Sequence, residues 1–270
     1  MWLPRLVASD IDGTLLNPEE RVTPTTAAAI AKVLAASVPF VLVSGRPPRW
    51  VPSVAEMAGV SGYAVCSNGA VLYDVASDRV VRAHQFDSIT LSDVVHGLSA
   101  AMPGVAFAAE RVGVSANGLA GGEFVTEGEY SHPWPDDESS PVTRAELTGH
   151  PAIKLLVRHH GVTSDELAAA VDGLIDGAAE VTFSSNVGML ELSVPGVTKA
   201  SGLAEVADLV GVSAEDVVAF GDMPNDVPML RWAGLGVAMA NAHPAALDAA
   251  DEQTASNAED GVANVLRRWF

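Results

Sequence analysis

Short apolar runs alternate with stretches of helical character along the N-terminal part of the chain. The runs Leu6–Ser9, Val38–Val43 and Tyr63–Cys66 predict buried strands, and Thr25–Ala36 predicts a helix that Thr23 caps. Apolar strands separated by helices are typical of a parallel sheet that has helices on both of its faces. The N-terminal pattern therefore predicts an α/β fold.

The C-terminal part of the chain returns to the same pattern. Lys199–Val210 predicts a helix, and Val217–Phe220 and Leu235–Met239 predict two further strands. These segments fit the same sheet as the N-terminal strands. The remaining elements predicted for this sheet and its helices are a hairpin of Ala70–Tyr73 with Val80–Arg82, and helices over Asn225–Trp232, Pro244–Ala250 and Gly261–Trp269.

The middle of the chain does not continue the regular alternation of apolar strands and helices. Helices are predicted over Ser88–Ala101 and Thr163–Asp176, and strands over Val105–Arg111, Ala152–His159 and Glu180–Phe183. Glu127–Pro141 is rich in Pro, Ser and acidic residues and predicts a long exposed loop. We expect a core domain formed by residues 1–82 and 191–270, with residues 83–190 inserted as a separate α+β domain.

The composition favours a soluble protein with a small ligand. The 270 residues are 49% hydrophobic and carry a formal net charge of -19, and such an acidic surface disfavours nucleic acids and anionic membranes. Cys66 is the single cysteine, which suits a reducing compartment. The N-terminal residues do not show the pattern of a secretory signal, and no apolar run reaches the length of a membrane span. We expect a cytoplasmic location.

Acidic residues follow two of the predicted strands. Asp10 and Asp12 come directly after the first strand, and Asp222 and Asp226 follow Val217–Phe220. Open α/β sheets place their ligands at the carboxyl ends of strands, where clustered carboxylates repel each other unless a divalent cation such as Mg²⁺ neutralises them. A carboxylate can also attack phosphorus, and a second one two residues away can act as general acid and base. Each segment alone could equally be a solvated acidic turn.

Two further positions carry groups that suit a phosphate. Ser44, Gly45 and Arg46 end the second strand, where a hydroxyl and N–H groups can hold an anion. Lys199 opens a predicted helix, where the helix dipole disfavours a cation unless an anion lies nearby. Either position by itself could be an ordinary helix cap or a surface lysine. The order of the four sites along the chain is the specific signal.

This ordered set resembles the haloacid dehalogenase-like (HAD) phosphatase superfamily. The matching segments are DIDGTL at Asp10, the serine of VSGR at Ser44, Lys199, and GDMPND at Gly221. The insertion has the position of the cap in Cof-type, class IIB members, and SNGA at 67–70 and LSVPGVTKASGL at 192–203 resemble that subgroup. Ala200 stands where the subgroup often has Gly. The resemblance implies a Rossmann-like three-layer core with an α+β cap of the C2 type.

The resemblance also implies roles for individual residues. Asp10 would be the nucleophile and a Mg²⁺ ligand, and Asp12 would be the general acid and base and would offer its backbone carbonyl to the metal. Asp222 would complete the metal ligands, while Asp226 would support Lys199 or the metal shell. The residues expected to hold the transferring phosphoryl group are Ile11 (through its backbone), Ser44, Gly45, Lys199 and Asn225.

The expected activity is Mg²⁺-dependent hydrolysis of small phosphorylated metabolites, with sugar phosphates favoured by the resemblance. A phosphotransferase or mutase with the same aspartyl-phosphate, and a sugar-phosphate-binding protein without activity, are alternatives. A receiver-type signalling domain also uses a phosphorylated aspartate, but it would be far shorter and would lack the insertion. Residues of the insertion would select the substrate. The candidates there are Glu110, Arg111, His132, Trp134 and Asn186, whereas Met189 and Leu190 are expected in the core of a strand.

Overall fold

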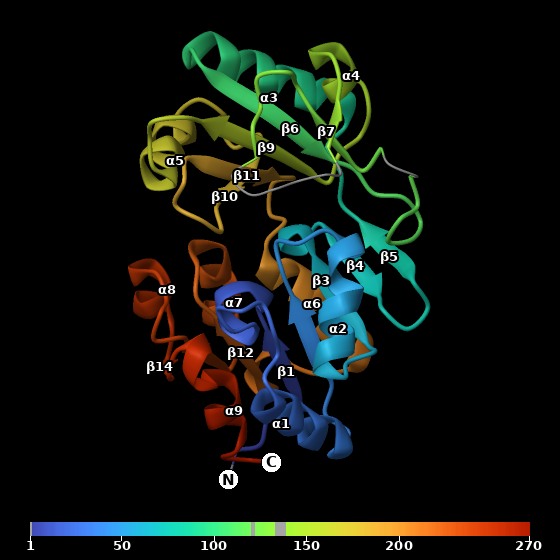
Figure 1. Cartoon of the computed structure of the whole chain (residues 1–270), viewed down its shortest axis with the longest axis vertical. Coiled ribbons are helices and arrows are strands. Elements are labelled where there is room, and N and C mark those ends of the chain that lie inside the picture. The colour runs from blue at the N-terminus through green and yellow to red at the C-terminus, as the bar shows by residue number, and fades with distance from the viewer. Residues whose placement is uncertain (1, 120–121, 133–138) are drawn as a thin grey trace. The chain divides into compact units, whose positions relative to one another are not determined.

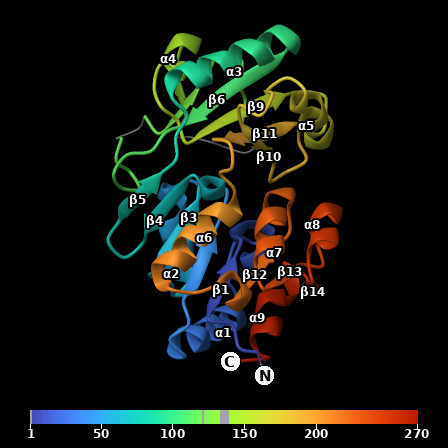
Figure 2. The ribbon, with the colours of Figure 1, turned by 180° about the vertical axis from the view of Figure 1, so that it is seen from behind.

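The computed structural model describes residues 2–119, 122–132 and 139–270 of the chain. These residues form two compact units (Figures 1 and 2). Unit 1 contains Met1–Val81 and Thr198–Phe270, and unit 2 contains Arg82–Val197. The chain therefore leaves unit 1, forms unit 2, and returns to unit 1 at the start of the helix that carries Lys199.

Unit 1 is built on an eight-stranded sheet with the order β14-β13-β12-β1-β2-β3-β4-β5. The neighbouring strands from β14 to β3 run parallel, and β4 turns back antiparallel to β3. The strands of this sheet are β1 (Leu6–Ser9), β2 (Phe40–Val43), β3 (Tyr63–Cys66), β4 (Val71–Asp74), β5 (Arg79–Ala83), β12 (Val217–Gly221), β13 (Leu235–Ala238) and β14 (Glu252–Gln253).

Helices cover both faces of this sheet. On one face α1 (Pro24–Ala35) packs against α2 (Val51–Ala58) and α9 (Gly261–Leu266), and on the other α6 (Lys199–Val210) packs against α7 (Val227–Trp232). The two faces can be followed in the two opposite views of the ribbon (Figures 1 and 2). A further helix, α8 (Pro244–Ala249), packs against α7. This arrangement confirms the predicted α/β class with a three-layer core.

Local sequence signals set the ends of these helices. The hydroxyl of Thr23 accepts a hydrogen bond from the backbone N–H of Thr26, which confirms the predicted cap of α1. Thr198 and Ser201 cap the start of α6, and Gly211 ends that helix with a φ of 68°, a left-handed conformation that suits glycine. The predicted bounds Leu6–Ser9, Tyr63–Cys66 and Lys199–Val210 are confirmed, while α9 ends three residues before the predicted Trp269.

Unit 2 has a separate six-stranded sheet with the order β10-β11-β9-β6-β7-β8. Its strands from β10 to β7 pair antiparallel, so this unit does not continue the parallel sheet, as predicted. Helices α3 and α4 pack on β6, and α5 packs on β10 and β11. The elements of this unit are α3 (Ser88–Ala101), β6 (Val105–Glu110), β7 (Phe124–Thr126), β8 (Ser140–Pro141), α4 (Arg144–Thr148), β9 (Lys154–His159), α5 (Ser164–Asp172), β10 (Glu180–Thr182) and β11 (Met189–Ser193).

The prediction of an exposed loop over Glu127–Pro141 is wrong for Glu127 and Tyr130, which are buried, and for Ser140–Pro141, which forms a strand, while residues 133–138 of this range lie outside the described residues. The Glu127 carboxylate can be buried at low cost, since one oxygen accepts a hydrogen bond from the backbone N–H of Phe107 and the other pairs with Arg144. Tyr130 is also buried and packs edge-on against Phe124. Ser140–Pro141 forms β8. Acidic and aromatic side chains thus join the loop to the sheet, an outcome that composition does not reveal.

Candidate active site

Asp10 lies directly after β1, at the carboxyl end of the parallel sheet. Its backbone N–H donates to the carbonyl of Phe220 at the end of β12, and its side chain is buried. The chain then turns at Gly13, which has a φ of 74°. A Cβ at this glycine would overlap the carboxylate of Asp222. The turn therefore needs glycine both for its backbone conformation and for the close approach of the second acidic segment.

Lys199 reaches the same point from the first turn of α6. Its side chain is only 1% exposed, and its ammonium group donates to Asp10 Oδ1 at 2.5 Å and to Asp226 Oδ1 at 2.7 Å. The predicted need for an anion near this lysine is therefore met by two carboxylates. The ion pairs offset the cost of burying the ammonium group, which would be prohibitive for an unpaired charge.

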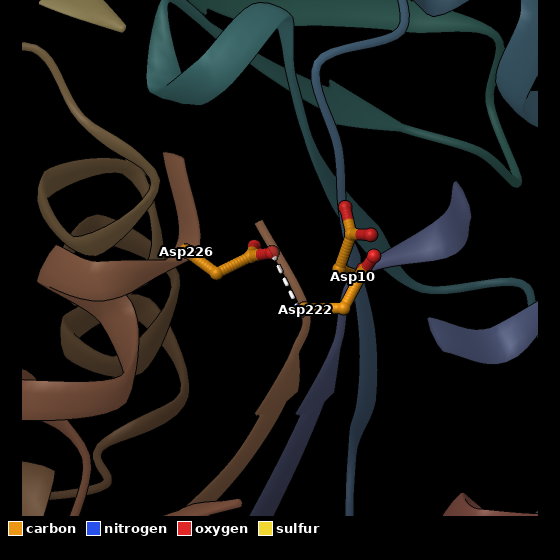
Figure 3. Close-up of side chains that lie close together, drawn as sticks. All are labelled: Asp10, Asp222 and Asp226. Atoms are coloured by element: carbon orange, nitrogen blue, oxygen red, sulfur yellow. Dashed lines mark hydrogen bonds between the residues drawn. The ribbon is translucent and has the colours of Figure 1, made fainter. Parts of the chain in front are cut away.

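Asp226 and Asp222 come from the segment that follows β12. Asp226 Oδ2 accepts hydrogen bonds from the backbone N–H groups of Asp222 at 2.9 Å and Met223 at 3.0 Å, and the first of these is drawn in Figure 3. The hydroxyl of Thr14 donates to Asp222 Oδ1 at 2.7 Å. Asp226 thus uses one oxygen to hold Lys199 and the other to shape the turn that presents Asp222.

The charges of this cluster do not balance. Asp10, Asp222 and Asp226 each place a carboxylate oxygen within 4.8 Å of the others (Figure 3). In the described part of the chain, Lys199 is the cation that pairs with this cluster, through Asp10 and Asp226, so three buried carboxylates face one positive charge. Burial, followed by the neighbouring carboxylates, raises the pKa of Asp222 to about 7. Burial also raises the pKa of Asp10 well above its usual value, although Lys199 opposes this shift. Burial acts to lower the pKa of Lys199, but Asp10 and Asp226 together raise it above its usual value.

This donor set suits a divalent metal ion. Hard carboxylate oxygens are the ligands that Mg²⁺ prefers, and a bound cation would offset both the burial of these charges and their mutual repulsion, the two effects that raise the pKa values of Asp10 and Asp222. Because both oxygens of Asp226 already accept hydrogen bonds, Asp10 and Asp222 are the better placed ligands. The chemistry of the cluster therefore fits a metal held by these two side chains.

Asp12 lies outside the cluster formed by Asp10, Asp222 and Asp226. The strand ends at Ser9, and the turn that follows points the Asp12 carboxylate to Arg46. Arg46 holds both oxygens, with Nε to Oδ2 at 2.8 Å and Nη2 to Oδ1 at 2.5 Å. Burial acts to lower the pKa of Arg46, but the hydrogen bonds to Asp12 raise it above its usual value. Strand alternation is no guide to side-chain direction once the strand has ended.

The remaining predicted site residues lie at neighbouring strand ends of unit 1. Ser44 is buried after β2, where its hydroxyl accepts a hydrogen bond from the backbone N–H of Arg46 at 3.0 Å. Gly45 is half-buried beside it, and Ile11 is fully buried in the turn after Asp10. Asn225 is also buried, and its amide nitrogen donates to Asn68 Oδ1 at 3.0 Å.

Three side chains of this site had no role of their own in the sequence prediction, although Arg46 belongs to the predicted anion site at Ser44 and Gly45. Thr14 bonds Asp222, Arg46 clamps Asp12, and Asn68 holds Asn225. Each lies within a segment that the sequence singled out, namely DIDGTL, VSGR and SNGA. Their partners lie far away in the sequence, so only their membership of these segments could have indicated that Thr14, Arg46 and Asn68 belong to the site.

The specificity candidates in unit 2 have different surroundings. The side chain of Asn186 accepts hydrogen bonds from the backbone N–H groups of Ser164 and Asp165, and so caps α5. Arg111 donates to the carbonyl of Glu146, a structural contact within α4. Glu110 is buried in β6, His132 contacts the hydroxyl of Tyr130, and Trp134 lies outside the described residues. Met189 and Leu190 are buried in β11, as predicted.

Comparison with known proteins identifies the family of this chain. The model of the haloacid dehalogenase-like hydrolases matches residues 7–266. The chain belongs to this family. A curated relative, 5-amino-6-(5-phospho-D-ribitylamino)uracil phosphatase YcsE of Bacillus subtilis, is 29% identical over 276 residues, which cover 98% of this chain and 95% of the relative. The pyridoxal phosphate phosphatase YbhA of Escherichia coli is 25% identical over 277 residues and covers 97% of each chain.

A solved structure described as a HAD subclass IIB sugar phosphatase has the same fold. It superposes with a TM-score of 0.79 at 21% identity and covers 97% of this chain and 98% of its own. These findings confirm the predicted family, its fold, and the predicted enzyme class, a phosphatase of the haloacid dehalogenase type. Among the described residues, every helix is too short or too polar to span a lipid bilayer.

Proposed function

We propose that this chain hydrolyses small phosphorylated metabolites with the help of Mg²⁺, using Asp10 as a covalent nucleophile. The observation that carries the proposal is the position of Asp10, which is buried at a strand end between Lys199 and the Asp222 carboxylate. An aspartate held there can attack a phosphoryl group only if positive charge offsets the repulsion between two anions. Lys199 supplies part of that charge.

The metal site that we propose consists of the Asp10 and Asp222 carboxylates with the backbone carbonyl of Asp12. Bound Mg²⁺ would supply Lewis-acid charge to the phosphoryl oxygens. Thr14 supports this assignment because its hydrogen bond fixes one oxygen of Asp222. Asp226 would serve the site by holding Lys199 in place.

The chain's own residues would then carry out two displacements. An Asp10 oxygen forms a bond to phosphorus as the bond from phosphorus to the leaving oxygen breaks, and Asp12 gives that oxygen a proton. Asp12 next takes a proton from a water molecule, whose oxygen attacks phosphorus and releases Asp10 and inorganic phosphate. Because Arg46 occupies both oxygens of Asp12, we infer that this ion pair opens during each proton transfer.

The phosphoryl group would be held by donors from neighbouring strand ends. We assign this role to the Ser44 hydroxyl, the backbone N–H groups of Ile11 and Gly45, the Asn225 amide and Lys199. All five positions belong to unit 1, and each directly follows a strand, lies in the turn after one, or opens a helix. Oxygens of a transferring phosphoryl group spread their charge over several such donors.

Unit 2 would act as the cap that selects the leaving group. This proposal keeps the expected insertion at residues 83–190 between core segments 1–82 and 191–270, and it agrees in kind with the compact unit Arg82–Val197. The curated relatives named above are phosphatases of a ribityl phosphate compound and of pyridoxal phosphate. We therefore favour small phosphomonoesters, sugar phosphates among them, and a cytoplasmic location.

The test is Mg²⁺-dependent hydrolysis of a generic aryl phosphate, followed by a screen of phosphorylated metabolites for phosphate release. Asp10→Asn should abolish turnover and leave the fold intact. Asp260→Asn is a matched control, because Asp260 also accepts side-chain hydrogen bonds, from Thr23 and Thr26, but lies outside the cluster. Near-normal turnover in Asp10→Asn would refute the assignment of the nucleophile. Transfer of phosphate to an acceptor without release would instead identify a phosphotransferase.

A further inference from the structure

The connection between β3 and β4 has an unusual backbone. Ser67, Asn68 and Gly69 all have positive φ values, of 51°, 56° and 101°. This conformation is disfavoured for residues with a side chain, because the Cβ atom crowds the neighbouring carbonyl oxygen. Two such residues in succession persist only where the surrounding structure holds them, and strained segments of this kind cluster at functional sites.

The Ser67–Gly69 loop is held by two elements of the catalytic site. The backbone N–H groups of Ser67 and Asn68 donate to the carbonyls of Arg46 and Ser44, each at 2.9 Å. Gly69 lies against the backbone of Thr198, where a Cβ would overlap the carbonyl. The loop is therefore packed between the segment that carries Ser44 and the start of the helix that carries Lys199.

The side chain of Asn68 reaches a third element. Its Oδ1 accepts the hydrogen bond from the Asn225 amide nitrogen at 3.0 Å, and both side chains are buried, with exposures of 3% and 4%. The Oδ1 atom of Asn225 has no hydrogen-bond partner among the described residues. The bond to Asn68 therefore fixes which way the Asn225 amide faces, and the amide nitrogen retains a second hydrogen that it can donate.

We infer that Asn68 is a positioning residue of the phosphoryl site, which acts by orienting the amide of Asn225. The inference rests on the proposed function, in which Asn225 donates to the transferring phosphoryl group. It adds to the expected catalytic set a fifth segment, the Ser67–Gly69 loop. The strain in this loop then has a use, because the left-handed backbone aims the Asn68 side chain at Asn225 while its N–H bonds Ser44.

The test compares Asn68→Gly, Asn225→Ala and the double variant with the wild type. Glycine keeps the left-handed backbone of position 68 and removes only the side chain. Ser37→Gly is the matched control, since Ser37 also has a positive φ, of 60°, but lies in the exposed turn after α1. We expect Asn68→Gly to lower kcat/KM for an aryl phosphate by about 10- to 100-fold relative to Ser37→Gly, since the Asn225 amide that would hold the phosphoryl group loses its orientation.

The double variant shows whether Asn68 acts through Asn225. We expect its kcat/KM to equal that of Asn225→Ala, because a residue that only orients another adds nothing once its partner is gone. Multiplying losses would overturn the inference, as would an Asn68→Gly variant that matches Ser37→Gly. A wild type without Mg²⁺-dependent hydrolysis would refute the proposed function instead. In that case the side-chain amide signal of Asn225 in an NMR spectrum tests whether Asn68 orients this amide. We expect the signal to shift in Asn68→Gly, and an unchanged signal would overturn the inference.

Discussion

Replacing Asp226 with asparagine tests the physical basis of the site most directly. The change is nearly isosteric, and Asp226 is fully buried. Its carboxylate accepts hydrogen bonds from Lys199 on one side and from the backbone N–H groups of Asp222 and Met223 on the other. An amide can accept on one side only. In either orientation its NH₂ group would therefore face a donor.

The expected cost follows from these contacts. Removing one partner of a buried ion pair typically costs about 3–5 kcal/mol, and each buried donor left unpaired costs about 1–3 kcal/mol. Relief of the repulsion among the carboxylates of Asp10, Asp222 and Asp226 offsets part of this loss. We therefore expect Asp226→Asn to lower the free energy of unfolding by about 3 kcal/mol. Turnover should fall at least about 100-fold, because Lys199 loses one of its two anchors.

Urea denaturation followed by tryptophan fluorescence suits this measurement. Four of the five tryptophans, Trp2, Trp50, Trp232 and Trp269, belong to unit 1, so their emission reports on the unit that holds the site. Asp251→Asn is the control, since the Asp251 carboxylate also accepts a backbone hydrogen bond, from Gly236, without a buried lysine. An Asp226→Asn protein as stable as this control, with normal turnover, would show that the buried ion pair does not organise the site.

Three further results are expected. Gly13→Ala should lower turnover at least about 100-fold and weaken Mg²⁺ binding, because its Cβ would displace the carboxylate of Asp222. Kinetics over a range of Mg²⁺ concentrations measure the turnover and the Mg²⁺ dependence. Wild-type values of both would contradict the close packing of Gly13 against Asp222. Thr14→Val should raise the Mg²⁺ concentration needed for half-maximal activity by about 3- to 10-fold, since it removes one hydrogen bond that orients Asp222, the proposed metal ligand. Asp222 and Asp10 have folded pKa values above their unfolded values, so without metal their contribution to stability is present at low pH and, for Asp222, is lost as pH rises through about 7. Mg²⁺ competes with these protons, so it should raise the melting temperature more at about pH 8 than at about pH 6, and an equal shift at both values would argue against a metal site at these carboxylates.

The sequence by itself determined the class of fold and most of its elements. Buried parallel strands are continuous apolar runs, so Leu6–Ser9 and Tyr63–Cys66 were located with their observed ends. Acidic and polar residues that follow such strands must gather at one edge of the sheet, because parallel strands end on the same side. The convergence of Asp10, Lys199 and Asp222 could therefore be anticipated from order alone.

Only the tertiary structure decided how the individual side chains pair. The Asp12 carboxylate pairs with Arg46 and lies outside the carboxylate cluster, and Asp226 faces Lys199 and two backbone N–H groups. Asn68 meets Asn225 across 157 positions of the chain. Such contacts depend on the direction of each turn after its strand and on a close approach that glycines such as Gly13 and Gly69 permit. Local periodicity carries no information about either, because both arise from packing between segments that are distant in sequence.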